Sequence, residues 1–168
     1  SFLGQYIREV VFGLQDGIVC TFGVITGVAI GLAHAPVVIF TGMVVIAVES
    51  SSMAIGTYLS TKAQQDIYKR WEKEEHYQVH HNPEWEKQEL VEIYQLKGFK
   101  GKLLKDVVAF FMKDKKRLLN EMMIQELKLS KEDFLNPLLA GGMMFFAYVL
   151  GGAIALSSYL FLPVPLAI

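Results

Sequence analysis

LLAGGMMFFAYVLGGAIALSSYLFL, residues 138–162, is the stretch that decides the fold of this chain. It contains no Asp, Glu, Lys, Arg or His. A helix needs about 20 mostly apolar residues to cross the hydrocarbon core of a bilayer. The stretch therefore predicts a transmembrane helix. Asn136-Pro137 just before it is a typical helix start, with Asn as the N-cap and Pro in the first turn.

Two further apolar runs lie near the N-terminus. They are VFGLQDGIVCTFGVITGVAIGLA, residues 11–33, and VVIFTGMVVIAVESSSMAIGTYL, residues 37–59. Each carries one charged residue, Asp16 in the first and Glu49 in the second. Because only the short segment 34–36 separates them, the two runs predict a transmembrane hairpin.

Glycine spacing predicts where these helices make close contacts. Gly23, Gly27 and Gly31 recur every four residues on one face of the first helix. Small residues at this spacing let two helix backbones approach closely in lipid. We expect the same kind of contact at Gly151 and Gly152 in the last run.

Between the apolar runs lies a charged middle. The chain has 168 residues, 52% of them hydrophobic, a net charge of −1 and a mean hydropathy of +0.33. Of the 16 Lys and Arg, all but Arg8 fall between Lys62 and Lys131. The small net charge argues against a nucleic-acid partner. Cys20 is the single cysteine, so an internal disulfide is excluded.

The distribution of Lys and Arg also predicts orientation. Basic residues flank the spans on the side of Arg8 and Lys62, whereas the turn at 34–36 has none. By the positive-inside rule, we expect the N-terminus and the charged domain to face the cytoplasm. The membrane would be the plasma membrane in a prokaryote and a vacuolar-type membrane in a eukaryote.

The predicted fold class is all-α. The second apolar helix continues past residue 59 without Pro or Gly and should end before Asn82-Pro83, a second helix start. Shorter helices are predicted over 83–96, 102–112 and about 117–129. We expect a polytopic helical membrane protein with three transmembrane helices. Its parts are a transmembrane hairpin (1–59), a cytoplasmic helical metal-binding domain (60–135) and a third transmembrane helix (136–168).

EKEEHYQVHHNPEWEKQELVE, residues 72–92, is the most acidic part of the charged middle. Glu86, Glu89 and Glu92 fall broadly on one side of a predicted helix. Carboxylates at this density repel one another unless a cation neutralises them. Spacing alone favours a solvated acidic face balanced by nearby lysines, and a cation site is the alternative.

Other residues of the charged middle are potential metal ligands. His76 and His80 have metal-compatible helical spacing, and Met122 and Met123 place two thioethers near Glu126. A set of carboxylate, imidazole and thioether groups suits Fe²⁺, Mn²⁺, Zn²⁺ or Co²⁺ better than Ca²⁺ or Mg²⁺.

Ionised residues inside membrane spans are costly, so they usually face a pathway or a partner. Asp16 and Glu49 are candidates for such a pathway, although Asp16 could instead lie at the interface or cap a helix. Met53 follows Glu49 by one turn and is either a soft metal ligand or a packing residue. We find no GxSxG, P-loop, CxxC or HExxH motif, so we expect no enzyme.

The sequence resembles the vacuolar iron transporter family of yeast and plants and its bacterial relatives. Five pieces spread over nearly the whole chain carry the resemblance. They are Asp16-Gly17, Ser52-Met53-Ala54-Ile55-Gly56-x-Tyr58-Leu59, Pro83-x-x-Glu86-x-x-Glu89-x-x-x-Ile93-Tyr94, Met122-Met123-x-x-Glu126-Leu127 and Ala147-Tyr148-Val149-Leu150-Gly151-Gly152.

The resemblance implies a homodimeric membrane protein that exchanges Fe²⁺, and often Mn²⁺, for protons. Divalent cations are then the substrate, and no cofactor is permanently bound. The resemblance places the transport pathway at Asp16 and Met53. The cytoplasmic metal ligands that it implies are Glu75, Glu86, Glu89, Met122, Met123 and Glu126.

The chain departs from the family pattern at three points. Gln78 stands where the family has a metal-binding Glu, and His76, His80 or His81 are candidates to replace it. A family carboxylate of the second span falls on Val45, and Glu49 one turn later is its candidate substitute. Family members have five spans, so we expect a fragment that lacks the last two.

Two other functions are compatible with the sequence. One is a membrane-anchored module that binds or senses divalent metal without transport. The other is an assembly protein whose charged domain only solubilises a helical hairpin.

Overall fold

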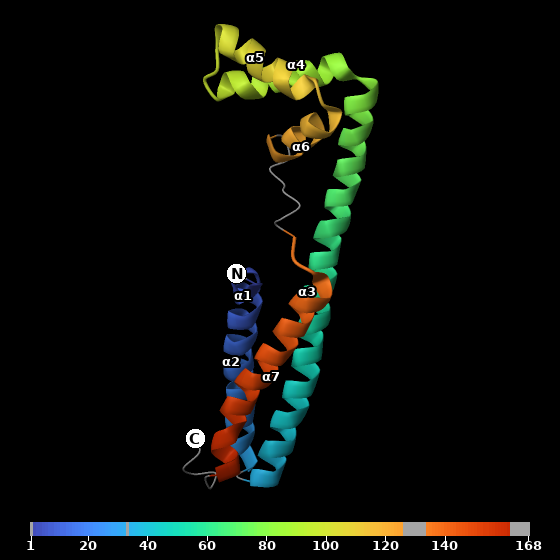
Figure 1. The fold of residues 1–168 in the computed structure, drawn as a ribbon. Coiled ribbons are helices and arrows are strands. Elements are labelled where there is room, and N and C mark those ends of the chain that lie inside the picture. Colours follow the sequence, from blue (N-terminus) through green and yellow to red (C-terminus); the bar gives the residue numbers. More distant parts are fainter. Residues whose placement is uncertain (1, 33, 126–133, 162–168) are drawn as a thin grey trace. The chain divides into compact units, whose positions relative to one another are not determined.

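The computed structural model describes residues 2–32, 34–125 and 134–161, and the regular structure in these ranges is helical (Figure 1). This confirms the all-α fold class. The helices are α1 (Phe2–Gln5), α2 (Ile7–Leu32), α3 (Ala35–His81), α4 (Pro83–Leu96), α5 (Gly101–Met112), α6 (Lys115–Gln125) and α7 (Pro137–Phe161).

The chain forms two compact units. The first contains Ser1–Lys62 and Leu135–Ile168, and we call it the membrane unit. The second contains Ala63–Phe134, and we call it the helical unit. Helix α3 supplies residues to both units, because it continues unbroken from its apolar first half into its charged second half.

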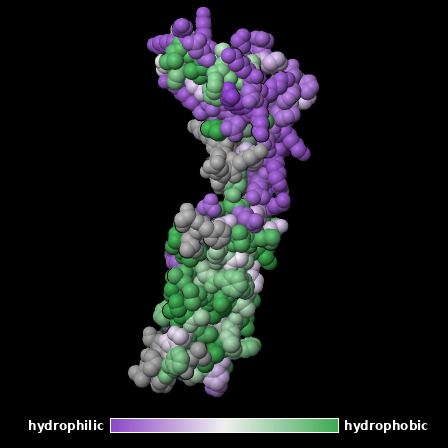
Figure 2. Space-filling view, in the orientation of Figure 1, coloured by the Kyte–Doolittle hydropathy of each residue, from purple (hydrophilic) through white to green (hydrophobic). Residues whose placement is uncertain are grey.

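The membrane unit has an apolar exterior. Its helices α2, α3 and α7 are long and apolar enough to cross a membrane, as predicted. Large side chains such as Phe40 and Phe146 are 65% and 71% exposed, and Figure 2 shows hydrophobic residues covering the visible face of this unit. Exposure of so many apolar side chains to water is unfavourable, whereas the hydrocarbon core of a bilayer accommodates them.

Helices α2 and α7 pack backbone to backbone through glycines. A Cβ on Gly17 would lie 2.3 Å from the carbonyl oxygen of Tyr148, and one on Gly151 would lie 2.3 Å from that of Leu14. Glycine, which has no Cβ, permits this close approach. The contact predicted at Gly151 and Gly152 is therefore confirmed.

Gly23, Gly27 and Gly31 make no close contact with another described helix of this chain, because no atom lies within 4 Å of a Cβ built on any of them. The contact predicted at these glycines stays a prediction for a partner outside the chain. Gly23 follows the buried Thr21 by two positions, which is about 200° around an α-helix. The three glycines thus face away from α7. The buried stripe of α2 is Glu9, Gly13, Gly17, Thr21, Ile25 and Ala29.

Both Asn-Pro pairs begin helices as predicted. The Asn136 side-chain oxygen accepts hydrogen bonds from the backbone N–H groups of Leu138 (3.0 Å) and Leu139 (3.3 Å). Asn82 occupies the N-cap position of α4 without a side-chain capping bond. Helix α4 is followed by Gly98, whose φ of 90° is readily adopted by glycine. The predicted end of the next-to-last helix, near residue 129, lies outside the described residues.

The helical unit has its own hydrophobic core. It consists of Val79 from α3, Leu90 and Tyr94 from α4, Leu104 and Val108 from α5, and Leu118 and Met122 from α6. The Tyr94 hydroxyl donates a hydrogen bond to Glu121 Oε1 (2.7 Å), so α4 and α6 are joined by a polar contact as well as by the core. This packing positions the acidic residues near the end of α3 and on α4.

We predict that Gly151→Ala destabilises the membrane unit by about 1–3 kcal/mol, because the new methyl group would overlap the α2 backbone. Thermal unfolding in detergent micelles measures the loss.

Gly142→Ala on the same helix is the matched control, because nothing lies within 4 Å of a Cβ at Gly142. It should unfold at or slightly above the temperature of the unmodified chain. Equal unfolding temperatures for the two variants would show that α2 and α7 are not in backbone contact.

Candidate functional site

Three glutamates converge in the helical unit. Glu75 lies near the end of α3 and is 7% exposed, and Glu86 lies in the first turn of α4 and is 1% exposed. Their carboxyl groups are within hydrogen-bonding reach, and the half-buried Glu89 is close enough to interact electrostatically. The next turns of the two helices bring Val79 and Leu90 into the core, which explains why the glutamates are withdrawn from water.

This arrangement raises the pKa of Glu75 to about 8. Burial is the largest cause, followed by the charge of Glu86, a hydrogen bond with Glu86 and the charge of Glu89. Each of these causes raises the pKa. A buried carboxyl surrounded by other carboxyls retains its proton unless a cation replaces it. Glu75 Oε1 also has no hydrogen-bond partner among the described residues.

The glutamates do not form a finished metal cage. In the part of the chain that the structure describes, no three His, Cys, Asp or Glu side chains are placed to hold a metal ion together. The three carboxyls are close enough to repel but not arranged around a common point. A cation would have to draw them together, or other ligands would have to complete the set.

The predicted methionine ligands lie in or beside the same core. Met122 is fully buried and packs in the cluster that contains Val79 and Leu90, and Met123 is 2% exposed. The thioether of Met122 thus shares a core with the turns that follow Glu75 and Glu86. Glu126 lies outside the described residues.

The histidines are on the surface of α3. The Nδ1 atoms of His80 and His81 are hydrogen-bonded to the carbonyl oxygens of His76 (2.8 Å) and Tyr77 (2.9 Å). Since a carbonyl oxygen only accepts, Nδ1 carries the proton in both rings. Gln78 is also exposed. None of the three histidines is among the groups that shift the pKa of Glu75.

The membrane unit contains the second set of predicted residues. Asp16 on α2 is half-buried and accepts a hydrogen bond from the thiol of Cys20, with 3.3 Å between Sγ and Oδ1. Glu49 on α3 is exposed on the chain, yet it lies within electrostatic range of both Cys20 and Tyr148. Met53 is half-buried one turn further along α3. The structure therefore brings Asp16 and Glu49 towards a common region.

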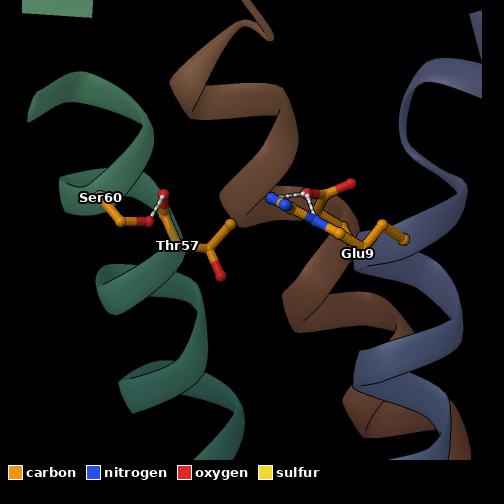
Figure 3. A network of polar contacts seen from close by, with 4 residues as sticks. Glu9, Thr57 and Ser60 are labelled. Atoms are coloured by element: carbon orange, nitrogen blue, oxygen red, sulfur yellow. Dashed lines mark hydrogen bonds and ion pairs between the residues drawn. The ribbon is translucent and has the colours of Figure 1, made fainter. Parts of the chain in front are cut away.

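Glu9 is a buried carboxylate that sequence reasoning missed. It is 1% exposed at the start of the buried stripe of α2, and Oε1 accepts hydrogen bonds from Nε (3.1 Å) and Nη2 (2.9 Å) of Arg8. Figure 3 shows Glu9 together with Thr57 and Ser60 of α3. Glu9 Oε2 has no hydrogen-bond partner among the described residues. The sequence does contain a signal for the burial of Glu9, because Glu9 precedes Asp16 by seven residues and therefore lies on the same face of the helix.

The family profile and the related proteins that match this chain all point to the same family. The sequence profile described as VIT family matches residues 7–168. The protein named vacuolar iron transporter 1 of Eucalyptus grandis is 32% identical over 161 residues, which are 96% of this chain. The protein of the same name from Arabidopsis thaliana is 32% identical over 95% of the chain. The vacuolar iron transporter of Toxoplasma gondii is 32% identical over 93% of it.

The chain spans only part of the length of these relatives. The matched region spans 65% of the Eucalyptus protein, 64% of the Arabidopsis protein and 52% of the Toxoplasma protein. The similarity extends over both units of the chain, from the start of α2 through α7.

The raised pKa of Glu75 predicts a pH dependence of stability. The pKa of Glu75 is near the ordinary glutamate value of 4.5 in the unfolded chain, whereas it is about 8 in the folded chain. Between these values the folded state binds more protons, so the free energy of unfolding falls as pH rises. Glu75→Gln should remove this dependence, and its unfolding temperature should exceed that of the unmodified chain more at pH 8 than at pH 5.

Glu74→Gln is the matched control, because Glu74 is exposed and pairs with Arg70 on the surface of α3. Thermal unfolding followed by circular dichroism at the two pH values measures both variants. If Glu75→Gln and Glu74→Gln shift the pH dependence equally, Glu75 is not buried among carboxyls.

Proposed function

This chain belongs to the VIT family, and on that basis we propose that it takes up Fe²⁺ on the cytoplasmic side and moves it across a membrane. The relatives at 32% identity carry names that describe vacuolar iron transport. The observation that carries the proposal is the convergence of Glu75, Glu86 and Glu89 in the helical unit, where burial and the neighbouring carboxylates raise the pKa of Glu75 to about 8. Such a cluster gains stability from binding a divalent ion, and its ligands are oxygens that Fe²⁺ and Mn²⁺ accept.

We assign the collection of metal to the helical unit. A divalent cation displaces the proton of Glu75 and neutralises the repulsion from Glu86 and Glu89. The ligand set is completed by residues further along the chain, namely Met122 and Met123 of α6 and Glu126. The thioethers favour Fe²⁺ over the harder Mg²⁺ and Ca²⁺, which prefer oxygen ligands.

We assign translocation to Asp16, Glu49 and Met53 in the membrane unit. Asp16 offers a carboxylate inside an apolar helix, where an ionised group is stabilised by a cation. Protons that reach these carboxylates from the far side weaken metal binding, which couples release of the metal to proton movement. The same chemistry admits Mn²⁺ as a second substrate.

We also propose that the chain forms a homodimer in a vacuolar-type or plasma membrane. Gly23, Gly27 and Gly31 support it, since they form an outward face of α2 that fits close contact with another helix. The charged helical unit then lies in the cytoplasm, as the positions of Lys and Arg indicate.

A second candidate function is metal binding or sensing without transport. The helical unit favours it, because this unit is compact by itself and contains the three glutamates together with Met122 and Met123. Tight binding of Mn²⁺ by the reconstituted chain, with no metal flux, would select this function.

The transport proposal predicts that Asp16→Asn lowers the flux of Fe²⁺ or Mn²⁺ into proteoliposomes by about tenfold or more, because the amide cannot balance the charge of the cation. A metal-sensitive dye trapped in the vesicles measures the flux. Cation influx at the unmodified rate in Asp16→Asn would exclude Asp16 from the pathway.

The collection site predicts that Glu89→Ala weakens Mn²⁺ binding about tenfold or more, because loss even of a group that only supports a metal ligand costs about 10–100-fold in affinity. Equilibrium dialysis of the protein with Mn²⁺ gives the dissociation constant. Glu92→Ala is the matched control, because Glu92 is exposed on the same helix. Equal affinities for the two variants would remove Glu89 from the ligand set.

A further inference from the structure

Helices α4 and α5 of the helical unit enclose a groove that the proposed function does not use. The two helices lie side by side and are joined by the short turn at 97–100, so they run in opposite directions (Figure 1). A groove of about 690 Å³ follows the line where they meet, and we call it the α4–α5 groove. Its apolar lining residues are Val91, Leu104, Val108, Ala109 and Met112.

The groove has a simple cause in the sequence of α5. Lys105, Ala109 and Lys113 recur every four residues, so they share one face of the helix. Ala109 is exposed and offers only a methyl group between two long side chains, which leaves the space open. The two lysines are separated by about 12 Å along the helix axis. A hollow of this length along two helices fits an elongated apolar chain.

The size and lining of the groove are those of a small-molecule site. Such sites typically measure about 300–1,000 Å³ and combine an apolar surface with a few polar groups. Here the polar lining groups are Glu84, Lys87 and Lys113 near one end and Gln95 and Lys105 near the turn. A helix of another protein would need a broader apolar surface than this single line of contact.

The end of the groove near the turn is positively charged. Residues 93–105 contain four lysines and no Asp or Glu. Lys105 lines the groove there and has no ion-pair partner in the part of the chain that the structure describes. At the other end Lys87 already pairs with Glu84, with 3.6 Å between Nζ and Oε2. The two ends therefore differ, and only the end near the turn offers a cation without a carboxylate.

We propose that the α4–α5 groove binds a long-chain fatty acid. The carboxylate lies at Lys105 and Gln95, whose ammonium and amide groups donate hydrogen bonds to it. The acyl chain lies along Val91, Val108 and Met112 and points away from the turn. An anionic head and an apolar tail match the charge at one end of the groove and the apolar surface along it.

This site is separate from the proposed collection of metal. Neither Glu86 nor Glu89 lines the groove, and its ligand is an organic anion instead of a cation. Loss of fatty-acid binding would therefore leave the proposal of metal transport in place, and loss of metal transport would leave the fatty-acid site in place.

The first experiment places a thiol in the groove. Cys20→Ser with Ala109→Cys gives a chain with one cysteine, because Cys20 is the single native one. The chain is reconstituted in lipid nanodiscs, and hexadecanoate is added from an albumin-buffered pool that fixes its free concentration. Hexadecanoate well above its dissociation constant should slow alkylation at position 109 by iodoacetamide at least about fivefold.

Two results of this experiment overturn the proposal. One is an alkylation rate that hexadecanoate leaves unchanged. The other is a thiol that does not react even without fatty acid, because a second copy of the chain or another protein surface then covers the groove.

A matched control places the thiol elsewhere in the helical unit. Cys20→Ser with Ala63→Cys carries it at an exposed position of α3 that does not line the groove. Its alkylation rate should not respond to hexadecanoate. Equal protection at positions 63 and 109 indicates a general effect of the fatty acid and overturns the assignment.

The second experiment tests the charge at the turn end. In the chain with the thiol at position 109, Lys105→Gln should raise the hexadecanoate concentration for half-protection about fivefold, as loss of one ion pair does. Lys102→Gln is the matched control, because Lys102 is exposed on the same helix and does not line the groove. Equal concentrations for the two variants overturn the placement of the carboxylate at Lys105.

The third experiment varies the ligand and leaves the protein unchanged. Each methylene group that is fully buried contributes about fourfold to affinity. Dodecanoate, which is shorter than hexadecanoate, should therefore need at least about tenfold more free ligand for half-protection. Hexadecanol, which has no charge, should protect more weakly than hexadecanoate. Equal protection by the acid and the alcohol, or by the long and the short acid, overturns the proposal.

Discussion

Three carboxylates meet where the end of α3 packs on the start of α4, and their mutual repulsion is the interaction on which the proposed collection of metal depends. Burial removes the water that would screen Glu75 from Glu86 and Glu89, so the pKa of Glu75 rises to about 8. A protein that gained nothing from this cluster could replace any of the three by a neutral residue. In the proposed function a divalent cation offsets this repulsion, so that a proton and a metal ion compete for the same carboxylates.

The membrane unit also withdraws polar groups from water, here through the close packing of two helices. Gly17 and Gly151 allow the backbones of α2 and α7 to contact each other, so no space for water remains between the two helices at these glycines. The polar groups beside this contact therefore depend on one another, as the hydrogen bond from the Cys20 thiol to Asp16 shows. In both units an apolar framework withdraws oxygen atoms from water, as the burial of Glu75 and Glu86 in one unit and of Thr21 and Tyr148 in the other illustrates.

Much of the fold could be predicted from the sequence, because the signals are local. The charge-free run at 138–162 and the two Asn-Pro pairs depend on short-range chemistry, and α7 and α4 begin at these pairs. The partner of the glycine face at Gly23 could not be predicted, since spacing by four residues shows that a face of small residues exists but not which helix meets it. Burial of Glu9 was missed for the same reason, because a charge near a helix start is ordinarily at the surface.

The ligand set was harder to predict from local patterns. Spacing alone favoured a solvated acidic face, and resemblance to the vacuolar iron transporters singled out Glu75, Glu86 and Glu89, which the structure brings together. It does not bring them into a finished cage. An anomalous-difference map from crystals soaked in Mn²⁺ would locate the ion most directly. We predict a manganese peak between the carboxylates of Glu75, Glu86 and Glu89, and a map with peaks only elsewhere would contradict the account.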